Sequence, residues 1–165
     1  MKKLINASIL VLFYFLSTSC GSTKVATSNL KENKKSGSTR EKVIATAKSY
    51  IGTHYKVGGT DHNGIDCSGL ALKSYESIGK KLPRTAHEQA DNGKRIYIAE
   101  FKPGDLIFFN EKKGSNKITH VGIIHTVSKE KVTFIHASTS HGVREDEMTS
   151  GYWKDHYVKA CNLID

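Results

Sequence analysis

The order of the helical and strand patterns constrains the fold of this chain more than any other feature. Apolar residues recur at helical spacing over 41–51 and again over 70–78, and a short helix is expected over 83–92. After the Pro-Gly pair at 103–104 the pattern changes to apolar stretches of strand length, at 105–109, 119–127, 132–137 and 157–164. Helices followed by strands predict an α+β domain and not an alternating βαβ fold.

The first twenty residues indicate export. Lys2 and Lys3 precede an apolar run over 4–16, and small residues then lead to Cys20. This charged, apolar and small order is typical of a signal peptide, which we place at 1–19. The apolar run is shorter than the roughly 20 residues that a membrane-spanning helix needs.

Cys20 directly follows the small residues, and there it resembles the acceptor cysteine of bacterial lipoprotein signals. The resemblance implies a lipidated Cys20 that anchors the protein in the cell envelope, with ordinary secretion as the alternative. Gly21, in place of an aspartate, favours the outer membrane, with the protein facing the periplasm. The segment 20–40 is polar with few large apolar side chains, so beyond the lipidated cysteine it predicts a flexible tether.

Length and charge limit the classes of function. The chain has 165 residues, enough for one ordinary domain, which we place at 41–165 and expect to be a monomer. Its net charge of +9 suits an anionic neighbour such as a cell wall. The lysines are scattered without interleaved aromatic residues, which favours solubility and weak attraction over specific nucleic-acid binding.

A glycine-rich stretch leads into Cys67 in the segment GGTDHNGIDCSGL, and Cys67 is expected in the first turn of the following helix. Unpaired backbone N–H groups and the helix dipole there favour a negative sulfur, which predicts a lowered thiol pKa and a nucleophile. The small Ser68 and Gly69 would let a substrate backbone approach, and the same N–H groups suit the oxyanion of a tetrahedral intermediate. Placement alone favours a buried core cysteine, so the chemistry needs a base nearby.

Two strand histidines supply a candidate base: His120 begins one expected strand and His136 lies late in the next. A three-residue loop over 128–130 would pair Gly122 with His136 and bring both imidazoles to one face, roughly 7 to 8 Å apart at their roots. His120 would then be the general base and His136 the group that orients it, whereas His125 faces the other side and is expected to be structural. A two-residue loop would separate the two faces unless a bulge intervened.

Five stretches together resemble the NlpC/P60 family of cell-wall cysteine peptidases, which share a papain-like core. They are HYKVGGTDHNGIDCSGL at 54–70, LPRTAHEQ at 82–89, FKPGDLIFF at 101–109, THVGII at 119–124 and FIHAS at 134–138. The resemblance implies N-terminal helices packed on an antiparallel β-sheet, with the nucleophile at a helix N-terminus. It also implies that Cys67 is the nucleophile, His120 the base and His136 the third polar member of a triad.

Four further positions take roles from the same resemblance. Tyr55 matches a tyrosine whose hydroxyl faces the active site and helps to hold the oxyanion. Asp66 and Ser68 match positions that hold a free amine of the peptide, although Asp66 could equally cap the helix. Arg84 matches an arginine that is either structural or meets a substrate carboxylate.

The resemblance implies a peptidoglycan hydrolase that cuts stem peptides between the γ-carboxyl of D-glutamate and a diamino acid, through an acyl-enzyme. No cofactor is expected, and no metal, because no close pair of Cys or His ligands occurs. The alternatives are an acyltransferase or amidase on the same scaffold, and a wall-binding lipoprotein without activity. Cys161 is expected to be a buried thiol, and a Cys67–Cys161 disulfide would contradict the role given to Cys67.

Overall fold

The computed structural model describes residues 37–149 and 151–165. The described chain begins in a helix, 37–49. The elements that follow are β1 (Thr60–Asp61), β2 (Gly64–Ile65), α2 (Cys67–Glu76), α3 (Ala86–Ala90), β3 (Lys94–Ile96), the 3₁₀ helix η1 (Ile98–Glu100), β4 (Leu106–Phe109), β5 (His120–Val127), β6 (Val132–Ser138), β7 (Gly142–Glu147), α4 (Gly151–His156) and β8 (Tyr157–Asn162).

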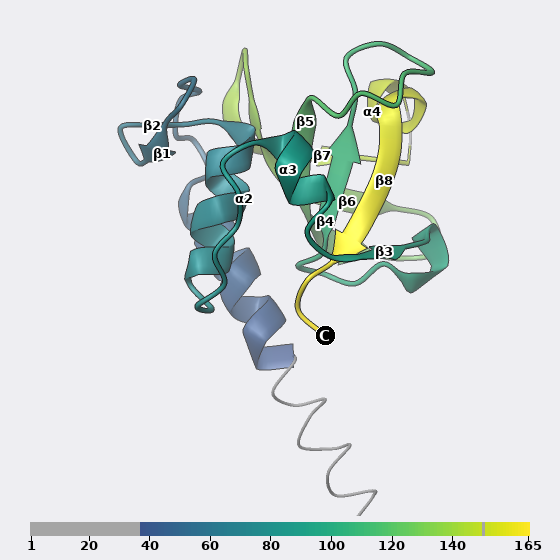
Figure 1. The fold of residues 1–165 in the computed structure, drawn as a ribbon, viewed down its shortest axis with the longest axis horizontal. Helices are drawn as coiled ribbons and strands as arrows, with labels where there is room; N and C mark the ends of the chain where they lie inside the picture. Colours follow the sequence, from purple (N-terminus) through teal and green to yellow (C-terminus); the bar gives the residue numbers. More distant parts are fainter. Residues whose placement is uncertain (1–36, 150) are drawn as a thin grey trace, which may run out of the picture.

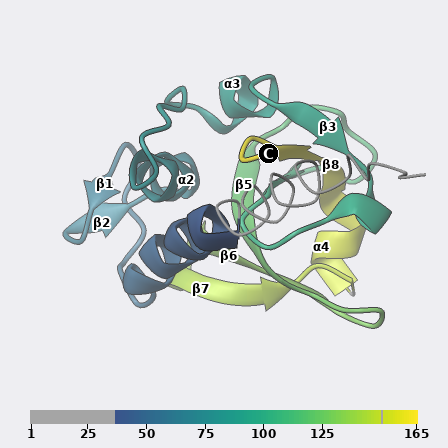
Figure 2. The ribbon, with the colours of Figure 1, turned by 90° about the horizontal axis from the view of Figure 1, so that it is seen from below.

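An antiparallel sheet of six strands, in the order β3-β8-β4-β5-β6-β7, forms the centre of the fold. The helix 37–49 and α2 lie on one side of this sheet, and α4 lies on the other (Figures 1 and 2). Because side chains alternate along a strand, the sheet contributes to a core on each face. Val121 and Ile123 pack against the helices, whereas Ile124 and Phe134 pack in the second core, beside Trp153 of α4.

The predicted α+β fold, with helices packed on an antiparallel sheet, is confirmed. The first helix already includes residue 37, so it begins before the apolar spacing that predicts it over 41–51. The sequence patterns also missed β3, β7 and α4, which are short and carry many charged side chains. Edge strands such as β7 (GVREDE) lack the apolar alternation on which strand prediction depends.

The hairpin between β5 and β6 reaches the predicted register by a different route. Val127 pairs with Val132, so the loop has four residues and not three. The register then shifts between Ile124 and Thr126, and Ile123 pairs with Ile135, as the three-residue loop would require. The irregularity falls at His125 and restores the shared face of the two catalytic candidates on these strands.

The predicted signal peptide, the lipidation site Cys20 and most of the tether lie outside the described residues. Within the described part of the chain, no helix has both the length and the apolar character needed to cross a membrane.

Candidate active site

Cys67 is the first residue of α2, as the sequence predicts, and Asp66 caps this helix. One carboxylate oxygen of Asp66 accepts the N–H of Gly69 at 2.7 Å, and the other accepts the N–H of Gly58 at 2.8 Å. The cap therefore fixes both the start of α2 and the glycine loop that precedes it. Cys67 itself is buried, with 7% of its surface exposed.

The small residues after Cys67 serve the packing of this loop. A side chain at Gly69 would collide with the carbonyl oxygen of Gly59. Ser68 is buried, and its hydroxyl donates to Asp66 at 3.1 Å while it accepts from Arg84 at 2.8 Å. The loop and α2 thus need a glycine and a small hydroxyl residue in order to fit together.

The expected lowering of the Cys67 pKa is wrong. Burial raises the pKa of Cys67 to about 11, and the charge of Asp66 acts in the same direction. The backbone N–H groups of Val121 and Ser68 oppose this rise but do not overcome it. Desolvation of the sulfur outweighs the helix N-terminus, so the resting group is a thiol.

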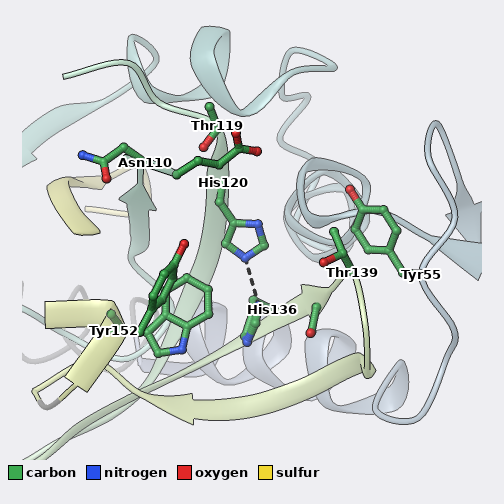
Figure 3. Close-up of a pocket in the computed structure, with 10 residues that line it drawn as sticks. Tyr55, Asn110, Thr119, His120, His136, Thr139 and Tyr152 are labelled. Atoms are coloured by element: carbon green, nitrogen blue, oxygen red, sulfur yellow. Dashed lines mark hydrogen bonds between the residues drawn. The ribbon is translucent and has the colours of Figure 1, made fainter. Parts of the chain in front are cut away.

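The two histidines meet as predicted. His120 Nε2 and His136 Nδ1 lie 2.9 Å apart, and the second ring nitrogen of His120 lies on the opposite edge of its ring (Figure 3). His136 is only 1% exposed. Burial lowers the pKa of His120 to about 3, and the neighbouring His136 adds to the effect. His120 is therefore a neutral imidazole that can accept a proton.

The sulfur and the imidazole lie beside the same short stretch of β5. The backbone N–H of Val121, the residue after His120, interacts with the Cys67 sulfur. Cys67 lines one pocket and His120 lines a second, and Tyr55 and Thr119 line both. The two pockets therefore adjoin, and together they form a candidate cleft with Cys67 on one side and His120 on the other.

Asp146 of β7 is a residue of the site that the sequence patterns missed. Its Oδ2 lies 3.0 Å from His136 Nε2 and accepts the indole N–H of Trp153 at 3.2 Å. Its Oδ1 pairs with Arg144 at 2.7 Å. The only available signal was the spacing of Asp146 from His136, which has a meaning only after β6 and β7 are known to pair.

Arg84 forms a fork with Asp66, at 2.9 Å from Nη1 to Oδ1 and 2.6 Å from Nη2 to Oδ2. Burial by itself raises the pKa of Asp66, but the hydrogen bonds from Arg84, Gly69 and Gly58 outweigh it and leave this pKa lowered. Asp66 therefore acts as the helix cap, which is one of the two roles that the sequence allowed for it. Arg84 is its ion-pair partner. Asp66, Ser68 and Arg84 line the pocket of Cys67 together with Tyr55.

The remaining candidates have structural contacts. His125 Nδ1 lies 2.9 Å from Glu145 Oε1, away from the His120–His136 pair. Cys67 and Cys161 are both free thiols, and Cys161 is buried on β8. The Cys67–Cys161 disulfide that would have contradicted the role expected for Cys67 is not formed.

A cysteine at a helix N-terminus, with a histidine pair on the adjacent antiparallel sheet, defines a cysteine hydrolase of papain-like architecture. The NlpC/P60 family profile matches residues 52–162. The chain therefore belongs to the NlpC/P60 family, and it is a cysteine peptidase of that family.

Similar proteins include the probable endopeptidase NlpC of Escherichia coli, 39% identical over 70% of this chain and 73% of that protein. The bifunctional muramidase/DL-endopeptidase CwlT of Bacillus subtilis is 38% identical over 79% of this chain, and the murein DD-endopeptidase MepS/murein LD-carboxypeptidase of E. coli is 34% identical over 76%. The chain covers only 38% and 63% of these two relatives. An NlpC/P60 family protein from Bacillus cereus has a similar structure, with a TM-score of 0.69 at 27% identity over 76% of this chain and 40% of that one.

Proposed function

We propose that this protein is a peptidoglycan hydrolase that cleaves stem peptides between the γ-carboxyl of D-glutamate and the diamino acid. Cys67, His120 and His136 are the proposed catalytic triad. The observation that carries this proposal is the hydrogen bond between His120 and His136 beside the Cys67 sulfur. The backbone N–H of Val121, the residue that follows His120, contacts that sulfur. The names of the relatives, which include a DL-endopeptidase and a murein endopeptidase, support the substrate class.

The proposed reaction begins from a neutral thiol and a neutral imidazole. His120 takes the proton of Cys67 as the sulfur attacks the scissile carbonyl, and the backbone N–H groups at the start of α2 and the Tyr55 hydroxyl stabilise the oxyanion. The protonated His120 then gives its proton to the leaving amine, which leaves an acyl-enzyme. His120 activates a water molecule that releases the acid and regenerates the thiol.

The position of the proposed base indicates which part of the substrate each pocket would receive. The leaving nitrogen must come within hydrogen-bond reach of His120, so the pocket that His120 lines receives the diamino acid. Glu111 supplies a carboxylate among the residues that line this pocket, and it suits the side-chain ammonium of a diamino acid. The pocket of Cys67 then receives the D-glutamyl side, where Arg84 is the candidate partner of a carboxylate and Asp66 and Ser68 are candidate partners of a free amine.

The test is digestion of defined stem peptides that contain lysine or diaminopimelate, with the products identified by mass spectrometry. We expect masses that correspond to cleavage after the γ-D-glutamyl residue, and no cleavage by Cys67→Ala. Products cut at another bond would replace the proposed specificity, and full activity of Cys67→Ala would remove Cys67 from the chemistry. A transferred acyl group in place of a free acid would support the acyltransferase alternative.

The role of Glu111 can be tested with a stem peptide whose own lysine side chain is acetylated. Loss of the ammonium charge of the peptide should raise KM several-fold for the protein that carries Glu111. It should have little effect on KM for Glu111→Gln, because that variant lacks the carboxylate that would pair with the ammonium group. An equal increase of KM in both proteins would show that Glu111 does not recognise this amine.

We infer export and lipidation at Cys20 from the layout of residues 1–20. In cells, Cys20→Ala should move the protein from the membrane fraction to the soluble fraction of the envelope. An unchanged membrane fraction would remove Cys20 as the anchor.

A further inference from the structure

We propose that Asp146 is a positioning residue that sets the proton arrangement of the His120–His136 pair, and so makes His120 Nδ1 the basic nitrogen. The inference rests on the proposed roles of His120 and His136. It adds Asp146 of β7 to the proposed triad of Cys67, His120 and His136. The sequence patterns did not predict this strand.

Asp146 continues the line of hydrogen bonds from His120 through His136, on the side of His136 that faces away from His120. His136 lies between His120, at 2.9 Å, and Asp146, at 3.0 Å, and each of its ring nitrogens has one of these partners. His136 is 1% exposed, so water does not compete for either nitrogen. The order of contacts is therefore His120 Nε2, His136 Nδ1, His136 Nε2 and Asp146 Oδ2.

The chemistry of these atoms fixes the direction of each hydrogen bond. Burial lowers the pKa of His136, which therefore carries a single N–H. A carboxylate only accepts, so this N–H must be on Nε2 and must point at Asp146. His136 Nδ1 is then an acceptor, and His120 must donate its Nε2–H to it. The lone pair of His120 is left on Nδ1, which lies on the edge of the ring away from His136 (Figure 3).

Two donors hold Asp146 in its role as an acceptor. Trp153 donates its indole N–H to Oδ2, and Arg144 pairs with Oδ1. An amide at this position would have to turn its NH₂ group toward Arg144 or toward His136 and Trp153. In the second orientation it would donate to His136 Nε2 and reverse both histidine tautomers, so the arrangement calls for a carboxylate.

Kinetics of Asp146→Ala on the stem peptide provide the first test. We expect kcat to fall about 10- to 100-fold with KM nearly unchanged, because the base is present but no longer held in one tautomer. In a His136→Asn background the same substitution should have little further effect, because the group through which Asp146 acts is gone. Asp155→Asn, an exposed carboxylate of α4, is the matched control and should leave kcat unchanged.

Substitutions of the neighbours of Asp146 separate positioning from packing. Trp153→Phe removes the indole donor and keeps an aromatic ring, and Arg144→Gln removes the ion pair. If the loss in Asp146→Ala only reflected a loosened α4, Trp153→Phe would reproduce it. A loss of activity in Trp153→Phe with unchanged histidine tautomers, or an undiminished effect of Asp146→Ala in the His136→Asn background, would overturn the inference.

The tautomers can be measured directly in the unmodified protein by ¹H–¹⁵N correlation spectra of the histidine rings. We expect His120 to be protonated on Nε2 and unprotonated on Nδ1, and Asp146→Asn to shift the pair toward the reverse arrangement. A proton on His120 Nδ1 in the unmodified protein would overturn the inference without any variant. This measurement needs no substrate, so it can test the inference even if the proposed bond specificity is wrong.

Discussion

At the scale of single residues, the proposed nucleophile Cys67 and its proposed base His120 rest in their uncharged forms. The pKa of Cys67 is raised to about 11 and that of His120 is lowered to about 3, and burial is the largest cause of both shifts. Each shift disfavours the charged form of its group, so the thiolate and the imidazolium arise together only as the proton moves between them.

The resting thiol predicts a distinctive pH dependence of Cys67 alkylation. The rate with iodoacetamide should rise about tenfold per pH unit from pH 6 and level off only near pH 11, because the thiolate fraction at pH 7 is about 10⁻⁴. Mass spectrometry of the Cys67 peptide measures this rate without interference from other cysteines. The denatured protein should level off near the free-thiol pKa of about 8.5. A plateau below pH 8 in the folded protein would mean that the sulfur is already anionic.

At the scale of elements, the position of α2 depends on the loop that precedes it. Asp66 ties this loop to the helix through Gly58 and Gly69, and Arg84 clamps Asp66 from outside. Gly69 permits the close approach of Gly59 to the helix. The placement of Cys67 is therefore a property of the loop and the helix together, and not of the helix N-terminus alone.

Gly69→Ala tests this dependence. The new methyl group would collide with Gly59, so the loop must move, and we expect a loss of about 1–3 kcal/mol in the free energy of unfolding. Urea denaturation measures the stability, and kcat should fall as well because Cys67 shifts with the helix. Gly37→Ala is the control, because its Cβ would meet nothing within 4 Å and helical alanine is favoured. Unchanged stability and activity in Gly69→Ala would refute the packing argument.

At the scale of the whole molecule, Arg40 connects parts of the chain that are far apart in sequence. From the first helix it donates to the carbonyl of Pro103 at 2.8 Å, to Asp105 at 2.9 Å and to Asp165 at 2.7 Å. Asp105 is fully buried. These contacts join the helical layer to the start of β4 and to the C-terminal residue, so they fix the layer that carries the active-site helix against the sheet.

Arg40→Met should cost about 3 kcal/mol of unfolding free energy, because it leaves the buried carboxylate of Asp105 without its cation. Chemical denaturation followed by circular dichroism measures the change. Lys73→Met breaks an exposed pair with Glu76 and should leave the stability nearly unchanged. Equal effects of the two substitutions would mean that burial of the Arg40 pair does not matter.

The α+β class, the helix start at Cys67 and the two strand histidines could be predicted from the sequence, because each depends on a local pattern of apolar spacing and turn residues. The shared face of His120 and His136 could be predicted as well, although the loop length behind that prediction was wrong and the bulge at His125 compensates for it. The contact of Asp146 with His136, the ion pair of Arg84 with Asp66 and the raised pKa of Cys67 could not be predicted in this way and became visible only in the folded chain. Contacts between distant segments and the exclusion of water arise from the packing of the whole chain, and no local pattern encodes them.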